Sequence, residues 1–170
     1  VDSLENEAGG DSGEDDSGLA VISADGRMVA FRSSAENLDL VTLDTNTVQD
    51  IYVRDRTLGT TVRVSINGTA EADADCLQPA ISGDGFTIAF HSRALTLVTP
   101  NDVDTMGDDI FIHDLLLGTT MKVTATPAGG ESAGQAYNAA LSYNGMLVVF
   151  ETSATDLGPT DAGTSTDIYL

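Results

Sequence analysis

Three acidic segments of the chain carry oxygen atoms at a spacing suited to a metal ion. They read DTNTVQD at residues 44–50, DVDTMGDD at 102–109 and DAGTSTD at 161–167. Calcium prefers carboxylate and carbonyl oxygens supplied by flexible loops. The segment at 102–109 is the strongest candidate, because its acidic residues surround Gly107. The predicted calcium ligands are Asp102, Asp104, Asp109, Asp44, Asn46 and Asp50.

The same residues also suit a purely structural role. Asp and Asn side chains accept hydrogen bonds from nearby backbone amides and so stabilise turns. Asp50, Asp109 and Asp167 each precede an apolar stretch of similar sequence, which favours turn capping for these three. No segment is an EF-hand, since the spacing is too short and the terminal Glu is missing. Both interpretations stay open at this point.

The chain offers few residues for catalysis. Its single cysteine, Cys76, has no disulfide partner within the chain and is expected to be a small buried side chain. His91 and His113 stand in no catalytic or metal-binding spacing. The stretch GDSG, which contains Ser12, looks like the nucleophile segment of trypsin-like proteases, but the matching His and Asp segments are missing. We therefore predict no catalytic residue.

The charge balance excludes two classes of partner. The 170 residues include 27 acidic and 7 basic ones, and the formal net charge is −20. Nucleic acids and anionic membranes are bound by basic surfaces, so neither is expected here. No apolar stretch reaches the roughly 18 residues that a membrane-spanning helix needs. Hydrophobic residues make up 41% of the chain, which is too many for a disordered acidic tail.

Two sequence blocks recur three times in the same order. The first reads ISADGRMVAF from Ile22, ISGDGFTIAF from Ile81 and LSYNGMLVVF from Leu141. The second reads DIYVRDRTLGTTVRV from Asp50 and DIFIHDLLLGTTMKV from Asp109, and its third copy is DIYL at 167–170. The copies are 58 to 60 residues apart. A period of this length is typical of repeat architectures such as β-propellers.

Each repeat predicts four short antiparallel strands, named a to d in chain order. Asp-Gly or Asn-Gly between two apolar stretches predicts a type I′ hairpin turn between strands a and b. Strands b, c and d are expected at 28–31, 51–54 and 61–64, and at 88–90, 110–113 and 120–123 in the second repeat. The predicted fold is all-β, with consecutive four-stranded antiparallel blades of a β-propeller. The chain holds about three blades, at residues 1–64, 65–123 and 124–170, and the last lacks its final strand.

These repeats resemble the TolB-like, WD-repeat-like propeller repeats of bacterial envelope and secreted proteins. The resemblance is carried by the S-x-D/N-G turn before an apolar strand that ends in Phe, by D-I-Y/F-V/I-x-D and by L-G-T-T-x-R/K-V. It implies contact with a protein partner and a periplasmic or extracellular location. It does not specify an activity, because propellers host many unrelated ones.

Three blades are too few to close a propeller, which usually has four to eight. We therefore expect either a fragment of a longer propeller or half of an oligomeric ring, such as a homodimer of two three-blade chains. Both arrangements leave apolar sheet surface for a partner.

The strand order also predicts where binding occurs. In an antiparallel meander the a–b and c–d turns share one end of the sheets, the short-turn end. The b–c loops and d–a connections share the other, the long-loop end, where variable segments favour binding. The predicted function is a non-enzymatic scaffold or binding module that uses this end for a protein or other ligand, with calcium as a candidate for ordering the loops. The alternative is part of a propeller hydrolase or lyase, as catalytic body or gating domain. A third possibility is a purely structural array of blades.

Overall fold

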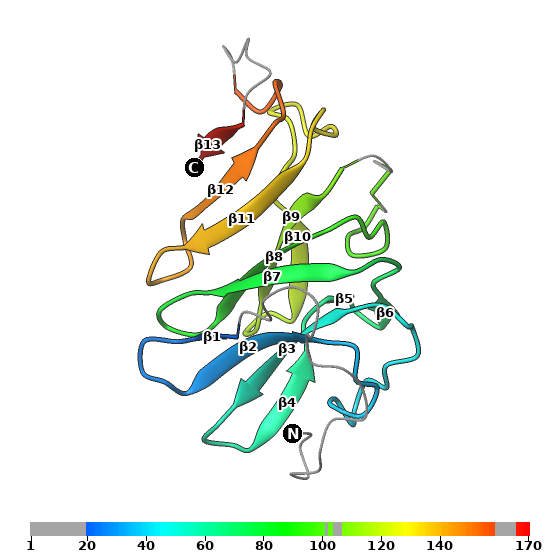
Figure 1. The fold of residues 1–170 in the computed structure, drawn as a ribbon, viewed down its shortest axis with the longest axis vertical. Coiled ribbons are helices and arrows are strands. Elements are labelled where there is room, and N and C mark those ends of the chain that lie inside the picture. Colours follow the sequence, from blue (N-terminus) through cyan, green and yellow to red (C-terminus); the bar gives the residue numbers. More distant parts are fainter. Residues whose placement is uncertain (1–19, 101, 104–106, 159–165) are drawn as a thin grey trace.

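The computed structural model describes residues 20–100, 102–103, 107–158 and 166–170. In this part of the chain the secondary structure consists of strands β1 to β13, and no helix is present. Three antiparallel sheets are stacked along the longest dimension of the molecule (Figure 1). The fold is thus an all-β partial propeller, which confirms the predicted fold class. Among the described residues, no helix is long and apolar enough to cross a membrane.

Each sheet follows the chain in simple up-and-down order. The first contains β1 (Val21–Ile22), β2 (Met28–Ser33), β3 (Asp50–Asp55) and β4 (Thr60–Arg63). The second contains β7 (Cys76–Ile81), β8 (Thr87–Ser92), β9 (Asp109–Asp114) and β10 (Thr119–Lys122). The third contains β11 (Ala136–Leu141), β12 (Val148–Thr152) and β13 (Asp167–Tyr169). A small hairpin of β5 (Ile66–Asn67) and β6 (Ala70–Glu71), which the sequence did not predict, lies in the first d–a connection.

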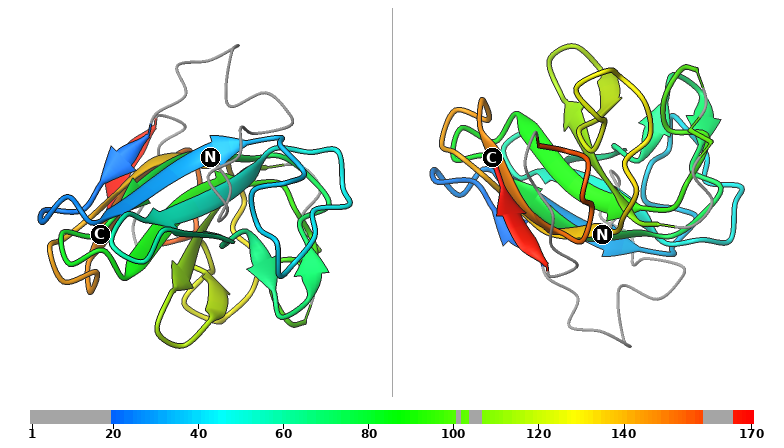
Figure 2. Two further views of the ribbon diagram at one scale, coloured as in Figure 1. Left: turned by 90° about the horizontal axis from the view of Figure 1, so that it is seen from below. Right: turned by 90° about the horizontal axis from the view of Figure 1, so that it is seen from above.

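The core lies between the sheets. In each sheet an aromatic residue of strand b stacks on one directly opposite in strand c, because residues paired across an antiparallel ladder project from the same face. The ring centroids are 6.0, 5.9 and 6.2 Å apart in the pairs Phe31–Tyr52, Phe90–Phe111 and Phe150–Tyr169. Small residues on the facing sheet, such as Ala30 and Ala89, are fully buried. Views along the stack show the faces of the sheets lying over one another (Figure 2).

The predicted type I′ turn between strands a and b is wrong. That turn needs two successive residues with positive φ, but only Gly26 of the Asp25–Gly26 pair has one, at 73°. Instead, Gly26 N donates to Ser23 O and the loop is longer by two residues. The Ser23 hydroxyl donates to Asp25 Oδ1 and accepts from the amide of Met28. The equivalent Ser and Asp or Asn side chains make the same bonds in the other two turns.

The short-turn end and the long-loop end of the sheets lie on opposite sides of the stack, as the strand order predicts. The a–b turns lie together at the left of the molecule in Figure 1, and the b–c loops of the first and second sheets lie at the right. The long-loop end therefore gathers the segments that carry the acidic residues, and it is there that their side chains meet.

Candidate functional site: a repeated cation and carboxylate cluster

A basic side chain at the end of β4 lies among three carboxylates. Arg63 Nη1 is 3.0 Å from Asp44 Oδ1 and 3.3 Å from Asp50 Oδ2, and Nη2 is 2.7 Å from Glu71 Oε1. The guanidinium side chain is only 2% exposed. The four residues come from strand d, the b–c loop, the start of strand c and the d–a connection, so the cluster joins every segment at the long-loop end of the first sheet.

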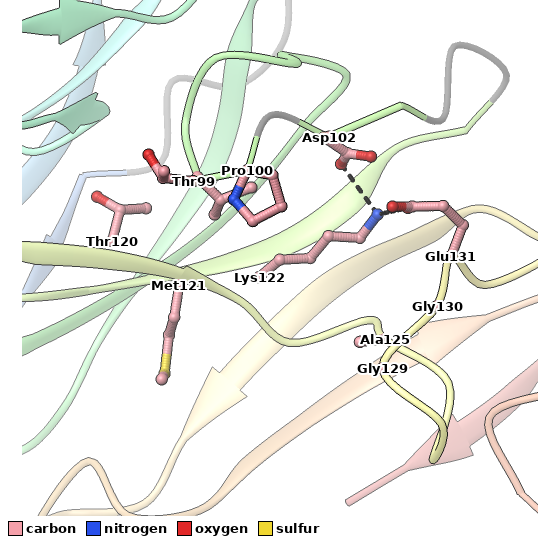
Figure 3. Close-up of a pocket in the computed structure, with 11 residues that line it drawn as sticks. Thr99, Pro100, Asp102, Thr120, Met121, Lys122, Ala125, Gly129, Gly130 and Glu131 are labelled. Carbon is pink, nitrogen blue, oxygen red and sulfur yellow. Dashed lines mark hydrogen bonds and ion pairs between the residues drawn. The ribbon is translucent and has the colours of Figure 1, made fainter.

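The second sheet repeats this arrangement with a lysine. Lys122 Nζ, at the end of β10, is 2.9 Å from Asp102 Oδ2 and 2.9 Å from Asp109 Oδ2. It also pairs with Glu131, and Figure 3 shows its ammonium group beside Asp102 and Glu131. The ammonium group lies beside a hollow of about 300 Å³ that is bordered by Pro100 and Gly129 among others. We refer to the two groupings as the Arg63 cluster and the Lys122 cluster.

Strand geometry places these side chains together. Residues two apart in a strand project from the same face, so Asp50 shares a face with Tyr52. Arg63 lies directly opposite Tyr52 in the ladder and projects from that face too. Its guanidinium can therefore extend along the strand to Asp50. Lys122 has the same relation to Phe111 and Asp109.

Neutral hydroxyl groups complete both clusters. Ser65 Oγ donates to Asp50 Oδ1 in the first, and Thr124 Oγ1 donates to Asp109 Oδ1 at 2.5 Å in the second. The Tyr52 hydroxyl donates to Asp44 Oδ2 at 2.6 Å. Burial nevertheless raises the pKa of Asp50 to about 6, although Ser65 and Arg63 act in the opposite direction.

Burial also raises the pKa of Asp109 to about 6, against the hydrogen bonds from Thr124 and Lys122. Each cluster thus holds an aspartate whose charge is costly inside the protein. A buried carboxylate of this kind requires a cation close by, and the chain supplies that cation itself.

The structure brings together four of the six predicted calcium ligands, in two pairs. Asp44 lies with Asp50, and Asp102 lies with Asp109; oxygens of the second pair and of Glu131 are all within 4.8 Å of one another. Asn46 instead turns its amide nitrogen toward Asp50 Oδ2, at 3.0 Å. Asp104 lies outside the described residues. Calcium at these oxygens stays a prediction, and the ion would compete with a basic side chain in each cluster.

The sequence patterns had not led us to predict four members of the clusters, which are Arg63, Lys122, Glu71 and Glu131. The signal was present, because the repeated L-G-T-T-x-R/K-V block places a basic residue 13 positions after the repeated aspartate in both complete copies. That spacing is the distance along one hairpin from the start of strand c to the end of strand d. Glu71 and Glu131 follow the basic residue by 8 and 9 positions.

Cys76 and His113, two of the candidate nucleophiles and bases named above, are buried. Cys76 is fully buried, its Sγ lies 3.5 Å from Ser92 Oγ, and burial raises the pKa of its thiol. His113 Nδ1 is 2.9 Å from Thr120 Oγ1, and burial lowers the pKa of this ring to about 4. These groups lack the solvent access that a substrate would need. Ser12 lies outside the described residues.

The tips of the b–c loops expose apolar side chains beside the clusters. Val41 is 90% exposed and Leu43 is also exposed, immediately before Asp44. In the second loop Val103 is 73% exposed, immediately after Asp102. Apolar loop residues thus alternate with buried charged anchors at the long-loop end.

No family model and no curated protein matches the chain. Similar solved structures include TolB from Acinetobacter baumannii, with 17% identity and a TM-score of 0.48 over 89% of this chain and 28% of that one. The tricorn protease is similar with 12% identity and a TM-score of 0.49 over 92% of this chain and 13% of that one. The chain therefore spans less than a third of the length of either protein.

Proposed function

We propose that this propeller module is a non-enzymatic binding module that holds a protein partner at its long-loop end. The observation that carries the proposal is the pairing of exposed apolar tips with buried anchors. Val41 and Val103 project into solvent, while Asp44 and Asp102, in the same two loops, are tied to Arg63 and Lys122. Loops fixed before binding lose little conformational freedom when a partner arrives, and this favours affinity.

The partner expected at this end is a protein with a basic rim around an apolar centre. The chain has a net charge of −20, and complementary charge increases the association rate and selects against acidic competitors. The apolar tips supply contact area of the kind found at the centre of protein interfaces. Self-association of the chain is a second form of protein contact, and it would use the sheet faces instead.

A role in a propeller hydrolase or lyase is the less favoured alternative. Cys76 and His113 are buried, and His91 is only slightly exposed. The basic side chain of each cluster is already ion-paired with carboxylates of this chain. A periplasmic or extracellular location is part of the proposal, supported by the acidic, lysine-poor composition. Cell fractionation followed by immunoblotting tests it, and recovery only with cytoplasmic markers would contradict it.

Site-specific photo-cross-linking tests the binding proposal. A photoreactive amino acid is placed at Val41, at Val103 or at Leu58, an apolar residue that is 68% exposed at the short-turn end. In extracts of the source organism, the first two positions should cross-link the same protein, and the Leu58 position should not. Equal adducts from all three positions, or none from the loop positions, would overturn the proposal.

A further inference from the structure

The a–b turn of the third sheet contains an asparagine at a position where the other two turns contain an aspartate. Asn144 is equivalent to Asp25 and Asp84. In all three turns the Oδ1 atom of this residue accepts two hydrogen bonds. One comes from the hydroxyl of the serine two residues earlier, and the other comes from the backbone amide two residues later. The third turn therefore has the donors that hold a carboxylate oxygen, although its own residue is an amide.

The lengths of these bonds show that a carboxylate lies closer to the donors than an amide does. The serine hydroxyl oxygen is 2.6 Å from the aspartate Oδ1 in the first and second turns, and 2.9 Å from Oδ1 of Asn144 in the third. Hydrogen bonds to an ionised acceptor are shorter and stronger than neutral ones. In the first turn the bond from Ser23, and then the backbone bond from Arg27, lower the pKa of Asp25. The turn thus favours a negatively charged residue.

Gly145, which follows Asn144, supplies a nucleophile for an intramolecular reaction of that side chain. Attack of the Gly145 backbone nitrogen on Cγ of Asn144 closes a succinimide ring, and glycine obstructs this approach least because it has no Cβ. Both reacting groups belong to adjacent residues, so no bimolecular encounter is needed. In the turn the Gly145 amide donates to Ser142 O at 3.1 Å, and this bond must open before the attack.

The two donors to Asn144 Oδ1 are placed to assist that attack. When the Gly145 nitrogen bonds to Cγ, negative charge develops on Oδ1. Hydrogen-bond donors that already point at an oxygen gaining charge stabilise the transition state. The Ser142 hydroxyl and the Met146 amide hold these positions, at 2.9 and 3.2 Å from Oδ1. The turn that suits the carboxylate product therefore also suits the reaction that forms it.

We infer that Asn144 is a site of spontaneous deamidation, and that the product in the folded chain is an aspartate in the same turn. The bond between Gly145 N and Cγ forms, the bond between Cγ and Nδ2 breaks, and Nδ2 leaves with the Gly145 proton as ammonia. Water then adds to Cγ, the bond from Cγ to Gly145 N breaks, and a proton returns to that nitrogen. Opening the ring at the other carbonyl would route the main chain through Cγ, lengthen the turn and displace the Oδ1 acceptor. The folded turn therefore selects aspartate over isoaspartate.

The other Asn-Gly pair of the chain, Asn67-Gly68, has a different geometry and is an internal control. It lies in the β5–β6 hairpin, where Asn67 donates through Nδ2 to Thr96 O at 3.2 Å and to Thr99 Oγ1 at 2.9 Å. These bonds hold the leaving nitrogen in place, whereas the bonds to Asn144 polarise the carbonyl group. We therefore expect Asn67 to deamidate more slowly than Asn144 in the folded chain.

Incubation of the purified full chain in mildly alkaline buffer tests the inference, with digestion at acidic pH and peptide mass spectrometry as the readout. The peptide that contains Asn144 should gain the mass difference between an amide and an acid about tenfold faster, or more, than the peptide that contains Asn67. Its product should co-elute with the same peptide from the Asn144→Asp variant, and not with a synthetic isoaspartyl peptide. The chain unfolded in urea shows the rate of each site without the turn. No conversion of Asn144 in the folded chain while the unfolded chain reacts, equal rates at the two sites, or a mainly isoaspartyl product would overturn the inference.

Two variants separate the effect of the turn from that of the Asn-Gly sequence alone. Ser142→Ala removes one donor to Oδ1 and should slow the conversion of Asn144 by about tenfold or more, with no change at Asn67. An unchanged or faster rate at Asn144 would contradict the assistance by these donors. Asn144→Asp should melt at a temperature no lower than the unsubstituted chain, because its carboxylate accepts the same two bonds; a lower one would contradict the fit of the product. The reaction occurs at the short-turn end, so its failure leaves the proposed binding at the long-loop end unaffected.

Discussion

The backbone amide of Asp84 donates a hydrogen bond of 2.8 Å to the carbonyl oxygen of Tyr143, and this bond joins the a–b turns of the second and third sheets. The equivalent bond of 2.9 Å runs from Ala24 N to Gly83 O between the first and second sheets. The a–b turns of all three sheets are thus joined by backbone hydrogen bonds along one side of the stack. Backbone bonds at the short-turn end therefore join neighbouring sheets, whereas the ion pairs of the two clusters join the loops, strands and connection of one repeat at the long-loop end.

Gly145, in the third a–b turn, should be intolerant of a side chain. A Cβ there would lie 2.1 Å from Thr87 Oγ1 of the second sheet, and its φ of 66° is strained for any other residue. We expect Gly145→Ala to lower the free energy of unfolding by about 2–4 kcal/mol, the sum of left-handed backbone strain and a steric clash. Urea denaturation measures it.

Gly118→Ala is the control for this substitution. Gly118 has a φ of 64°, but a Cβ there meets nothing within 4 Å. Its cost should be the backbone strain alone, about 1–2 kcal/mol. Equal losses for the two variants would show that the contact between the second and third sheets contributes nothing at Gly145.

Arg63→Met should destabilise the fold strongly. The substitution keeps the apolar bulk but leaves Asp44 and Asp50 buried without their cation, and removing one partner of a buried ion pair costs about 3–5 kcal/mol. Arg93→Met removes a pair with Asp108 in which the arginine is 56% exposed, and it should cost less than about 1 kcal/mol. Chemical denaturation of both variants makes the comparison. A loss for Arg63→Met no larger than for Arg93→Met would contradict a structural role of the Arg63 cluster.

His113 should make the fold sensitive to acid. Burial lowers the pKa of this ring to about 4, while an unfolded histidine titrates near 6.5. Its contribution is therefore fully present above pH 6.5 and is lost as the pH falls toward 4, up to about 3 kcal/mol. His113→Gln should remove that loss. NMR titration of the ring proton should give a midpoint near pH 4; a midpoint near 6.5 would refute the prediction.

The stability contributed by Asp50 and Asp109 depends on pH in the opposite direction to that contributed by His113, over a similar pH range. Their pKa values near 6 exceed those of unfolded aspartates, so the stability they confer is present below about pH 4 and is lost as the pH rises through 6. The pH profile of the unsubstituted chain mixes both effects. The difference in stability between that chain and His113→Gln, measured at each pH, isolates the histidine.

Lys122 should control any response to calcium. Removing its ammonium leaves Asp102, Asp109 and Glu131 within 4.8 Å of one another and without a neutralising charge, and such oxygens are the ligands calcium prefers. We expect calcium to raise the melting temperature of Lys122→Gln more than that of the unsubstituted chain. Magnesium, which demands a stricter octahedral geometry, is the control ion. A larger calcium effect on the unsubstituted chain would indicate a site that does not compete with Lys122.

Local patterns were sufficient to predict the sheets. The apolar stretches that follow the Asp-Gly or Asn-Gly turn and end at Phe31, Phe90 and Phe150 identified strand b in every repeat. The turn type was wrong because Asp25-Gly26 was considered without Ser23. The serine hydroxyl bridges the loop to Met28, and this longer loop needs positive φ at the glycine alone.

Prediction of the site was incomplete for a different reason. The acidic residues are close in sequence and easily noticed, whereas Arg63 and Lys122 reach them only after a hairpin brings strand d beside strand c. No basic residue lies close to these carboxylates in sequence, so they were interpreted as metal ligands. The missing information was the register between the strands, which places an opposite charge on the same face.

The two clusters also affect the charge that the surface of the molecule carries. Arg63 and Lys122 are enclosed among carboxylates, and Arg32 is buried as well, so only four of the seven basic side chains of the chain remain to offset the acidic exterior. Dissolved salt acts on that exterior and hardly on the enclosed pairs. Rising ionic strength should therefore weaken the capture of a basic partner, while the two clusters and the loops that they hold stay intact.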